Sequence, residues 1–135
     1  MQPAGCTVIG AGANLNGTEF PNISKDTAGL NASYTMPLNN ADEALVLSGN
    51  WYYRSRKLGS VTGGSNAAIP SYSLSNARLD YNNIGGTAFS AGVWVRNLTN
   101  KLYFSYRNDV RALSGYDIVG YGEPRTFGVD LKYRF

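Results

Sequence analysis

The residue types that carry most enzyme chemistry are scarce in this sequence. Its 135 residues include no histidine and a single cysteine, Cys6. Ser-His-Asp triads, Cys-His dyads and histidine metal sites are therefore excluded. The carboxylates are scattered, and the adjacent pair Asp42-Glu43 falls in a predicted turn, so no acid–base pair can be argued. We expect no enzyme activity, no cofactor and no metal site.

One glycine-rich stretch imitates a nucleotide-binding motif. Val8–Ala13 reads Val-Ile-Gly-Ala-Gly-Ala, which is similar to the start of a dinucleotide fingerprint. Position 15 is leucine instead of glycine or alanine, and no helical pattern follows that could hold a pyrophosphate. We therefore expect no dinucleotide binding by this stretch.

Residues suited to ligand contact lie near the C-terminal end. Asn108–Tyr121 is predicted as a loop, and it contains aromatic and charged side chains that make good contacts. The same side chains could also form a solvated loop that touches nothing. The candidate ligand contacts are Arg111, Tyr116, Asp117 and Tyr121.

The basic residues are spread along the chain. Net charge is +3, from 12 Lys+Arg against 9 Asp+Glu, and the cations are not clustered, so the sequence does not predict nucleic-acid binding. Several cations fall on the polar sides of predicted strands, where they could face an anionic ligand or pair with Asp80 and Asp130. These cations are Arg54, Arg78, Arg96, Lys132 and Arg134.

Apolar residues recur with a period of two along most of the chain, which predicts β-strands. No segment shows a convincing helical period. The sequence thus predicts an all-β fold, an antiparallel meander of about six strands in one domain, 1–135, with residues 1–24 forming a loop or a partial strand. The predicted strands are Lys25–Pro37, Glu43–Arg56, Tyr72–Asn82, Thr87–Asn97, Leu102–Arg107 and Thr126–Phe135.

The alternation fits two environments. In a soluble sandwich the apolar face packs on a second sheet, whereas in a transmembrane barrel it faces lipid. Polar faces rich in Asn, Ser, Thr and Gly, with aromatic residues at strand ends, favour the barrel. A one-residue slip of the last strand would turn Asp130, Lys132 and Arg134 toward lipid, where a basic residue costs about 2–4 kcal/mol at the midplane.

Three stretches resemble the C-terminal part of TonB-dependent outer-membrane receptors. Asn97-Leu98-Thr99-Asn100-Lys101 is similar to the family's Asn-Leu-x-Asp-Lys-x-Tyr motif, with Asn100 in place of the usual aspartate. Gly122–Phe135 resembles the family's terminal strand, and Gly17–Lys25 resembles a stretch that precedes the sixth strand from the end. The likeness spans roughly residues 5–135.

The resemblance implies that the chain is the C-terminal part of a 22-stranded transmembrane β-barrel in the bacterial outer membrane. At about 9–11 residues per strand, such a barrel needs about 200–240 residues before loops are counted, so the chain would be a fragment without the plug domain. The complete receptor would import a small-molecule or metal-chelate nutrient such as a ferric siderophore. TonB would act only through the missing N-terminal region, and the fragment alone would not transport.

The resemblance also implies a role for the last strand. Its apolar residues resemble the C-terminal signal that the outer-membrane assembly machinery reads, through β-augmentation of a strand edge. The alternative is an ordinary terminal strand. The residues of this signal are Phe127, Val129, Leu131, Tyr133 and Phe135.

An orientation follows from the predicted strand count. With Phe135 at the periplasmic rim, Asn97–Lys101 and Lys57–Ser71 fall on the periplasmic side. Asn39–Asp42, Asn82–Gly86 and Asn108–Tyr121 then fall outside the cell.

Two other interpretations remain open from the sequence. One is a soluble all-β ligand-binding module, such as a sandwich. The other is a complete small outer-membrane barrel of about eight strands. The small barrel would need two more strands from residues 1–24, where the sequence predicts at most one.

Overall fold

The computed structural model describes residues 19–38, 42–59, 68–110 and 114–135. These residues form β-strands joined by turns, which confirms the predicted all-β, antiparallel fold. A short 3-10 turn, η2 (Ile84–Gly86), joins two of the strands. The strands are β1 (Thr27–Pro37), β2 (Ala44–Arg54), β3 (Lys57–Leu58), β4 (Ala68–Ile69), β5 (Tyr72–Asn82), β6 (Phe89–Arg96), β7 (Phe104–Asp109), β8 (Asp117–Tyr121) and β9 (Thr126–Tyr133).

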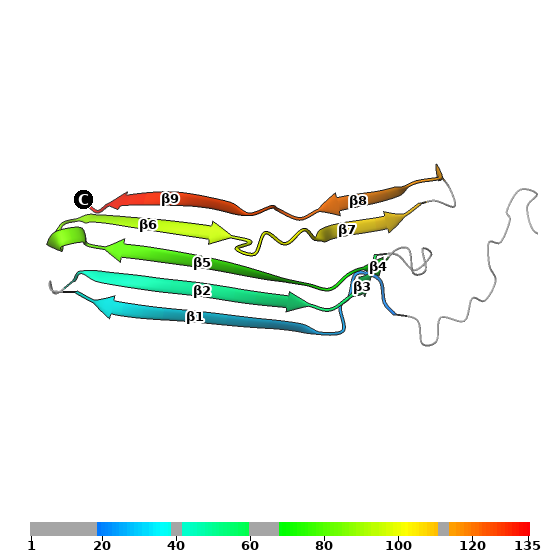
Figure 1. Ribbon diagram of the computed structural model, residues 1–135, viewed down its shortest axis with the longest axis horizontal. Helices are drawn as coiled ribbons and strands as arrows, with labels where there is room; N and C mark the ends of the chain where they lie inside the picture. Colours follow the sequence, from blue (N-terminus) through cyan, green and yellow to red (C-terminus); the bar gives the residue numbers. More distant parts are fainter. Residues whose placement is uncertain (1–18, 39–41, 60–67, 111–113) are drawn as a thin grey trace, which may run out of the picture.

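The main sheet contains five antiparallel strands in the order β1-β2-β5-β6-β9 (Figure 1). Each of β1, β2 and β5 is 11 residues long, and the sheet is drawn out along the strand direction. β1 and β9 are the edges of this sheet. All five strands fall within segments that the period-two pattern predicts as strands.

The predicted strand Leu102–Arg107 does not belong to this sheet. β7 begins at Phe104 and pairs with β8, a strand that lies inside the segment predicted as the Asn108–Tyr121 loop. β7 continues in the direction of β6, and β9 continues in the direction of β8 (Figure 1). Asn97–Lys101 is therefore a bulge between β6 and β7, which run in the same direction. Its prediction as a turn that reverses the chain was wrong.

The miscounted strand also inverts the predicted placement of the turns. Phe89 pairs with Tyr133, and the Arg134 N–H donates to the Ala88 carbonyl over 3.1 Å. The C-terminus thus lies at the same end of the sheet as the tight turn at Asn82–Gly86, where opposite ends were predicted. The β3–β4 region and the β7–β8 hairpin lie at the other end (Figure 1).

The tight turn itself forms where the sequence predicts one. Asn83 has φ of 51°, and Gly85 has φ of 61°, in the left-handed region that asparagine and glycine tolerate best. The Gly86 N–H donates to the Asn83 carbonyl over 2.8 Å and closes the turn.

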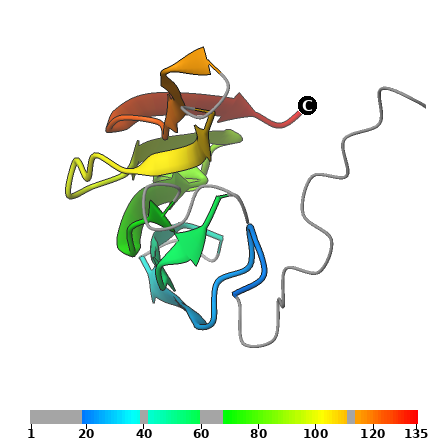
Figure 2. The same cartoon turned by 90° about the vertical axis from the view of Figure 1, so that its right-hand side faces the viewer.

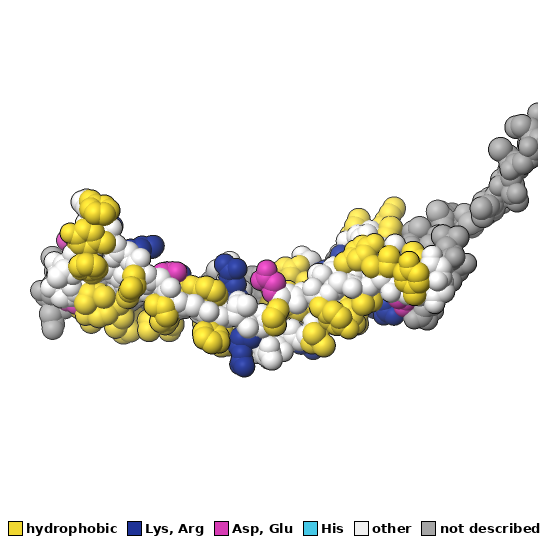
Figure 3. All heavy atoms as spheres, turned by 90° about the horizontal axis from the view of Figure 1, so that it is seen from above, with side chains coloured by type: hydrophobic (Ala, Val, Ile, Leu, Met, Phe, Trp, Pro, Cys, Tyr) yellow, Lys and Arg dark blue, Asp and Glu magenta, His cyan; other side chains and the backbone are white. Residues whose placement is uncertain are grey.

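The described residues contain almost no hydrophobic core. Ile69 of β4 is fully buried, at 0% exposure, next to the end of the main sheet. Large apolar side chains of the sheet remain exposed: Phe127 is 82%, Leu131 80% and Tyr34 64% exposed. Seen along the β9 edge, hydrophobic side chains gather on one long side of the molecule (Figure 3). Nothing in the described part of the chain packs over them as a second layer.

Candidate functional site

The register divides the main sheet into two chemically different faces. Tyr34, Leu47, Leu79, Val93 and Val129 stand opposite one another on successive strands. The side chains of this row, and those two and four positions before or after them along each strand, lie on one side of the sheet. We call this side the apolar face. The opposite side is the polar face, with the row Ser33, Ser48, Arg78, Trp94 and Gly128. Each of the five strands of the main sheet keeps the alternation that the sequence predicts.

Aromatic side chains gather at both ends of the apolar face. At the end with the C-terminus, the rings of Phe89 and Tyr133 lie 4.7 Å apart, and Phe135 meets Tyr133 edge-on at 5.1 Å. Toward the other end, Trp51 and Tyr53 stack with ring centroids 6.2 Å apart. The rows between are mostly aliphatic, with Tyr34 and Phe127 among them. An apolar strand face with aromatic rings toward both ends is a feature of transmembrane β-barrels.

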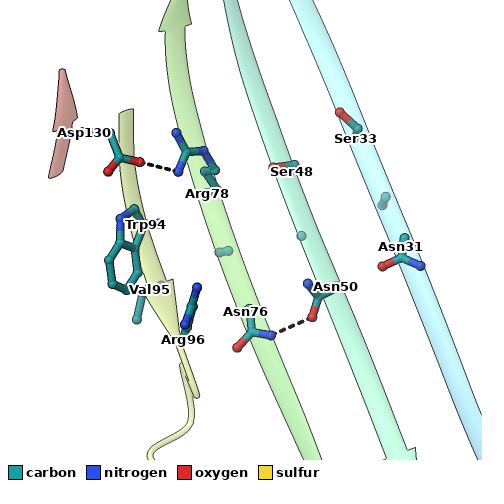
Figure 4. Close-up of a pocket in the computed structure, with 13 residues that line it drawn as sticks. Asn31, Ser33, Ser48, Asn50, Asn76, Arg78, Trp94, Val95, Arg96 and Asp130 are labelled. Carbon is teal, nitrogen blue, oxygen red and sulfur yellow. Dashed lines mark hydrogen bonds and ion pairs between the residues drawn. The ribbon is translucent and has the colours of Figure 1, made fainter. Parts of the chain in front are cut away.

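The polar face is concave. A hollow of about 720 Å³ lies over its centre and is lined by residues from all five strands of the sheet (Figure 4). Asn76 donates a side-chain hydrogen bond of 2.7 Å to Asn50 on the neighbouring strand. Eight of the 13 lining residues carry amide, hydroxyl or charged side chains, so this hollow can hold water and polar ligands.

An ion-pair cluster stands at one side of the hollow. The Arg78 guanidinium donates to Asp80 through Nε and Nη2, at 2.7–2.9 Å and 2.6 Å, and to Asp130 through Nη1 at 2.6 Å. Gly92, opposite Asp80, leaves room for this fork, since a Cβ there would lie 2.6 Å from Asp80 Oδ1. Of the five cations predicted to pair with carboxylates such as Asp80 and Asp130, Arg78 does so, whereas no ion pair to the described residues forms at Arg54, Arg96, Lys132 or Arg134.

Trp94 covers the polar face beside this ion-pair cluster. Trp94 lies over Gly128 of β9, where a Cβ would lie 2.5 Å from its ring. The Arg96 guanidinium stands 5.2 Å from the Trp94 ring centroid. The two tryptophans of the chain therefore lie on different faces, Trp51 on the apolar face and Trp94 on the polar face.

Near the end of the sheet with the β7–β8 hairpin, the polar face carries a buried cation. Arg54 is 9% exposed, and its guanidinium stands 4.5 Å from the centroid of the Tyr72 ring, which in turn packs against Tyr103 at 4.4 Å. Its Nε and Nη2 atoms make no hydrogen bond to the described residues. Burial, together with the charge of Arg54, lowers the pKa of Lys57 nearby in β3.

The bulge between β6 and β7 is organised by Asn97, which is 4% exposed. Its amide Nδ2 donates to the carbonyls of Lys101 and Glu123 at 2.9 and 3.1 Å, and its Oδ1 accepts the Lys101 N–H at 2.8 Å. Its own backbone N–H donates to the Asn76 side chain over 2.8 Å. Asn97 thus ties the bulge to β5 and to the segment between β8 and β9. The sequence motif was visible, but its role as this junction was not predicted.

The predicted assembly signal lies on one edge of the sheet. Phe127, Val129, Leu131 and Tyr133 of β9 share the apolar face, and Phe135 follows them at the C-terminus, exposed. The structure places these residues together on an accessible strand edge. Their role in assembly stays a prediction.

The predicted ligand contacts do not form one cluster. Arg111 lies outside the described residues. Tyr116, 57% exposed, and Asp117 lie where β8 begins, and Asp117 pairs with Arg107 at 3.3 Å. Tyr121 ends β8, where its ring packs on Phe104 at 5.2 Å, at the opposite end of the hairpin.

A buried carboxylate was also missed from the sequence. Glu43 is 7% exposed and accepts hydrogen bonds from the Tyr81 hydroxyl and, at 2.8 Å, from the Gly85 N–H. It closes the tight-turn end of the sheet. The sequence shows Glu43 only as half of an exposed acidic pair, because the register that brings Tyr81 to it cannot be read from one strand.

Neither a metal centre nor a spanning helix is present in the described residues. They contain no group of three or more His, Cys, Asp or Glu side chains that could hold a metal ion. None of their helical turns is long or apolar enough to cross a membrane.

Comparison with known proteins shows a likeness of fold. The scan against protein-family models found no matching family, and the search of curated proteins found no significant match. Among solved structures, the chain is similar to BauA, the ferric preacinetobactin receptor from Acinetobacter baumannii, with a TM-score of 0.58 and 23% identity. The match covers 82% of this chain but 15% of that receptor. The chain thus spans a small part of the length of the protein it resembles.

Proposed function

We propose that this chain is part of the wall of an outer-membrane receptor barrel, of the TonB-dependent type, that imports a nutrient such as a ferric siderophore. The observation that carries the proposal is the five-stranded sheet whose apolar face has no second layer over it among the described residues and carries aromatic rings toward both ends, while its concave face is polar. Likeness of fold to a ferric-siderophore receptor supports the same assignment. In this role the chain is a passive, non-enzymatic wall that cannot transport by itself.

The dimensions of the strands support a membrane-spanning role. Strands of 11 residues extend about 36 Å at a rise of about 3.3 Å per residue. Tilted by about 45°, they cover about 25 Å, which is the height of the apolar band of outer-membrane barrels. The hollow on the polar face would then open toward the lumen, where the import path of the complete receptor lies.

The corrected topology supports a new orientation. With Phe135 at the periplasmic rim, the tight turn at Asn82–Gly86 is periplasmic, and Lys57–Ser71 and the β7–β8 hairpin lie outside. Short periplasmic turns and longer outer connections are the usual arrangement in these barrels. Tyr116 and Asp117 then stand on the outer side, where an incoming metal chelate would arrive. The β9 edge is the surface that we propose the assembly machinery reads.

The two tryptophans provide the test. Trp94→Phe leaves Trp51 as a reporter of the apolar face, and Trp51→Phe leaves Trp94 as a reporter of the polar face. Each variant of the full chain is reconstituted into phosphatidylcholine vesicles whose acyl chains are brominated near the headgroup. We expect bromine to quench Trp51 and aqueous iodide to quench Trp94.

The opposite pattern, or quenching of both tryptophans by iodide alone, would overturn the proposal. Iodide quenching of both is the outcome expected of a soluble all-β module. A chain that stays in the buffer and shows a cooperative thermal transition there would also overturn it.

A further inference from the structure

The β6–β7 bulge presents two cations side by side. Asn97 Oδ1 accepts the Lys101 N–H at 2.8 Å, and Asn100 Oδ1 accepts the Arg125 N–H at 3.2 Å. Asn100 directly precedes Lys101 in the chain, so these two bonds hold the backbones of Lys101 and Arg125 next to each other. Both residues are exposed. The buried Asn97 makes this arrangement a fixed part of the sheet.

The bulge that carries Lys101, and the position of Arg125 just before β9, place these residues toward the apolar side of the sheet. Arg125 precedes Phe127 by two positions, so on an extended strand it shares the face of Phe127. The bulge projects outward from the sheet (Figure 2), and basic side chains interrupt the hydrophobic outline in Figure 3. Leu98 and Leu102 flank the bulge and are 47% and 74% exposed. We call Leu98, Lys101, Leu102 and Arg125 the basic ledge.

The two cations of the basic ledge lack an acidic partner. Across the described residues, ion pairs occupy Lys25, Arg56, Arg78 and Arg107, while no carboxylate lies within ion-pair distance of Lys101 or Arg125. Residues 1–18, 39–41, 60–67 and 111–113 contain no Asp or Glu that could supply one. Two neighbouring positive charges without a counter-charge attract an anion from outside the chain.

We propose that the basic ledge binds the phosphate groups of membrane lipids. The inference rests on the proposed function and adds a specific ligand to it. Lys101 follows Val95, the last apolar-face residue of β6, and Arg125 precedes Phe127, the first of β9. The Leu98 N–H donates to the Ser75 carbonyl, and Ser75 lies opposite Trp51, so the ledge is level with the aromatic end of the apolar face. Lipid headgroups begin near that level if the face spans the hydrocarbon. Leu98 and Leu102 contact the outer acyl chains, and the two cations contact the phosphates above them.

The test compares binding to vesicles of two compositions. The full chain is titrated with vesicles of phosphatidylcholine alone and with vesicles that also contain phosphatidylglycerol, and the Trp51 fluorescence is followed. A basic residue near an anionic surface strengthens binding about fivefold. K101Q/R125Q should therefore bind the anionic vesicles about 25-fold more weakly and the neutral vesicles unchanged. The matched control R96Q/K132Q removes the same charge from the polar face and should change binding less than twofold.

The arms of this experiment separate the possible outcomes. Equal losses in both double variants would overturn the proposal, because net charge alone would then explain the preference. Inorganic phosphate that displaces the chain from anionic vesicles at unchanged ionic strength would also overturn it and assign the ledge to free phosphate. In either case, bromine quenching of Trp51 in neutral vesicles would leave the proposed function standing. Loss of that quenching in the unmodified chain would refute the proposed function itself.

Discussion

A cation placed in the middle of the apolar face should reveal which solvent that face meets. Leu47 lies in β2 between Tyr34 and Leu79 and is 51% exposed. Because half of its surface is already uncovered, Leu47→Arg removes little packing within the chain. If the face meets water, the change should stay within about 0.5 kcal/mol, as for most surface substitutions. If it meets lipid, an arginine near the midplane should cost about 2–4 kcal/mol.

The register provides two matched controls for this cost. Ala28 lies on the same face but at the end of β1, where an arginine should cost about 0–1 kcal/mol. Ser33, one residue before Tyr34, lies on the polar face and lines the hollow, so Ser33→Arg should stay within about 0.5 kcal/mol. The three variants add the same charge and differ in the face and the depth at which it is added.

Vesicle partition measures the cost directly. A loss of 2–4 kcal/mol corresponds to an affinity about 30- to 900-fold weaker for phosphatidylcholine vesicles, measured by co-sedimentation. Ala28→Arg should weaken binding by at most about fivefold, and Ser33→Arg by less than about threefold. Binding of Leu47→Arg within threefold of the unmodified chain would refute the assignment of the apolar face to lipid, whatever the other two variants do.

Three further outcomes follow from the geometry. Gly128→Ala should destabilise the sheet by about 1–3 kcal/mol in urea titrations, because a Cβ would lie 2.5 Å from the indole that covers it, whereas Gly29→Ala, with 3.9 Å of room, should be neutral. Arg78→Met should lower the free energy of unfolding by about 1–3 kcal/mol, and with it the urea midpoint, because Asp80 and Asp130 lose charged hydrogen bonds. An unchanged midpoint would contradict a stabilising role for this ion-pair cluster. The hydrogen bond from Lys25 holds the pKa of Glu19 below its usual range. The stability that the Lys25–Glu19 ion pair contributes is therefore complete above the ordinary glutamate pKa and is lost as pH falls through the lowered pKa. The protection of the amides around residue 19 against hydrogen exchange, relative to their intrinsic rates, should fall over that acidic range, and Glu19→Gln should abolish the dependence.

The faces of the strands could be predicted because the alternation of residue types within each strand shows which side chains share a face. In β9, apolar residues at every second position indicate one buried or lipid-facing side whatever the neighbours are. The sequence of one strand does not show which residues of a neighbouring strand pair with it. The contact of Glu43 with Tyr81 and the cover of Trp94 over Gly128 both depend on register, which only the assembled sheet defines.

The misread bulge has a physical reason. Asn97 and Asn100 both adopt positive φ, near 50°, as the asparagines of a hairpin turn would. Residue type predicts this local conformation, but it does not predict the direction that the chain takes afterwards. β8 was missed for a related reason: Ile118 and Val119 are adjacent, are followed by Gly120, and show no alternation. The missed strand and the misread turn together produced the inverted orientation.

The two faces and the two edges of the main sheet limit the surroundings in which it is stable. Exposing the apolar face to water forgoes about 1.5–3 kcal/mol for each large side chain, while placing the cluster of Arg78, Asp80 and Asp130 in hydrocarbon would cost more than its hydrogen bonds return. The proposed boundary, with lipid on one side and water on the other, satisfies both faces, as would a second sheet packed on the apolar face. In lipid, however, the unpaired N–H and C=O groups along the free edges of β1 and β9 each cost several kcal/mol. A lipid-facing sheet of this kind therefore needs strands paired to both edges, which a longer chain would supply and which other copies of this chain would supply in vesicles.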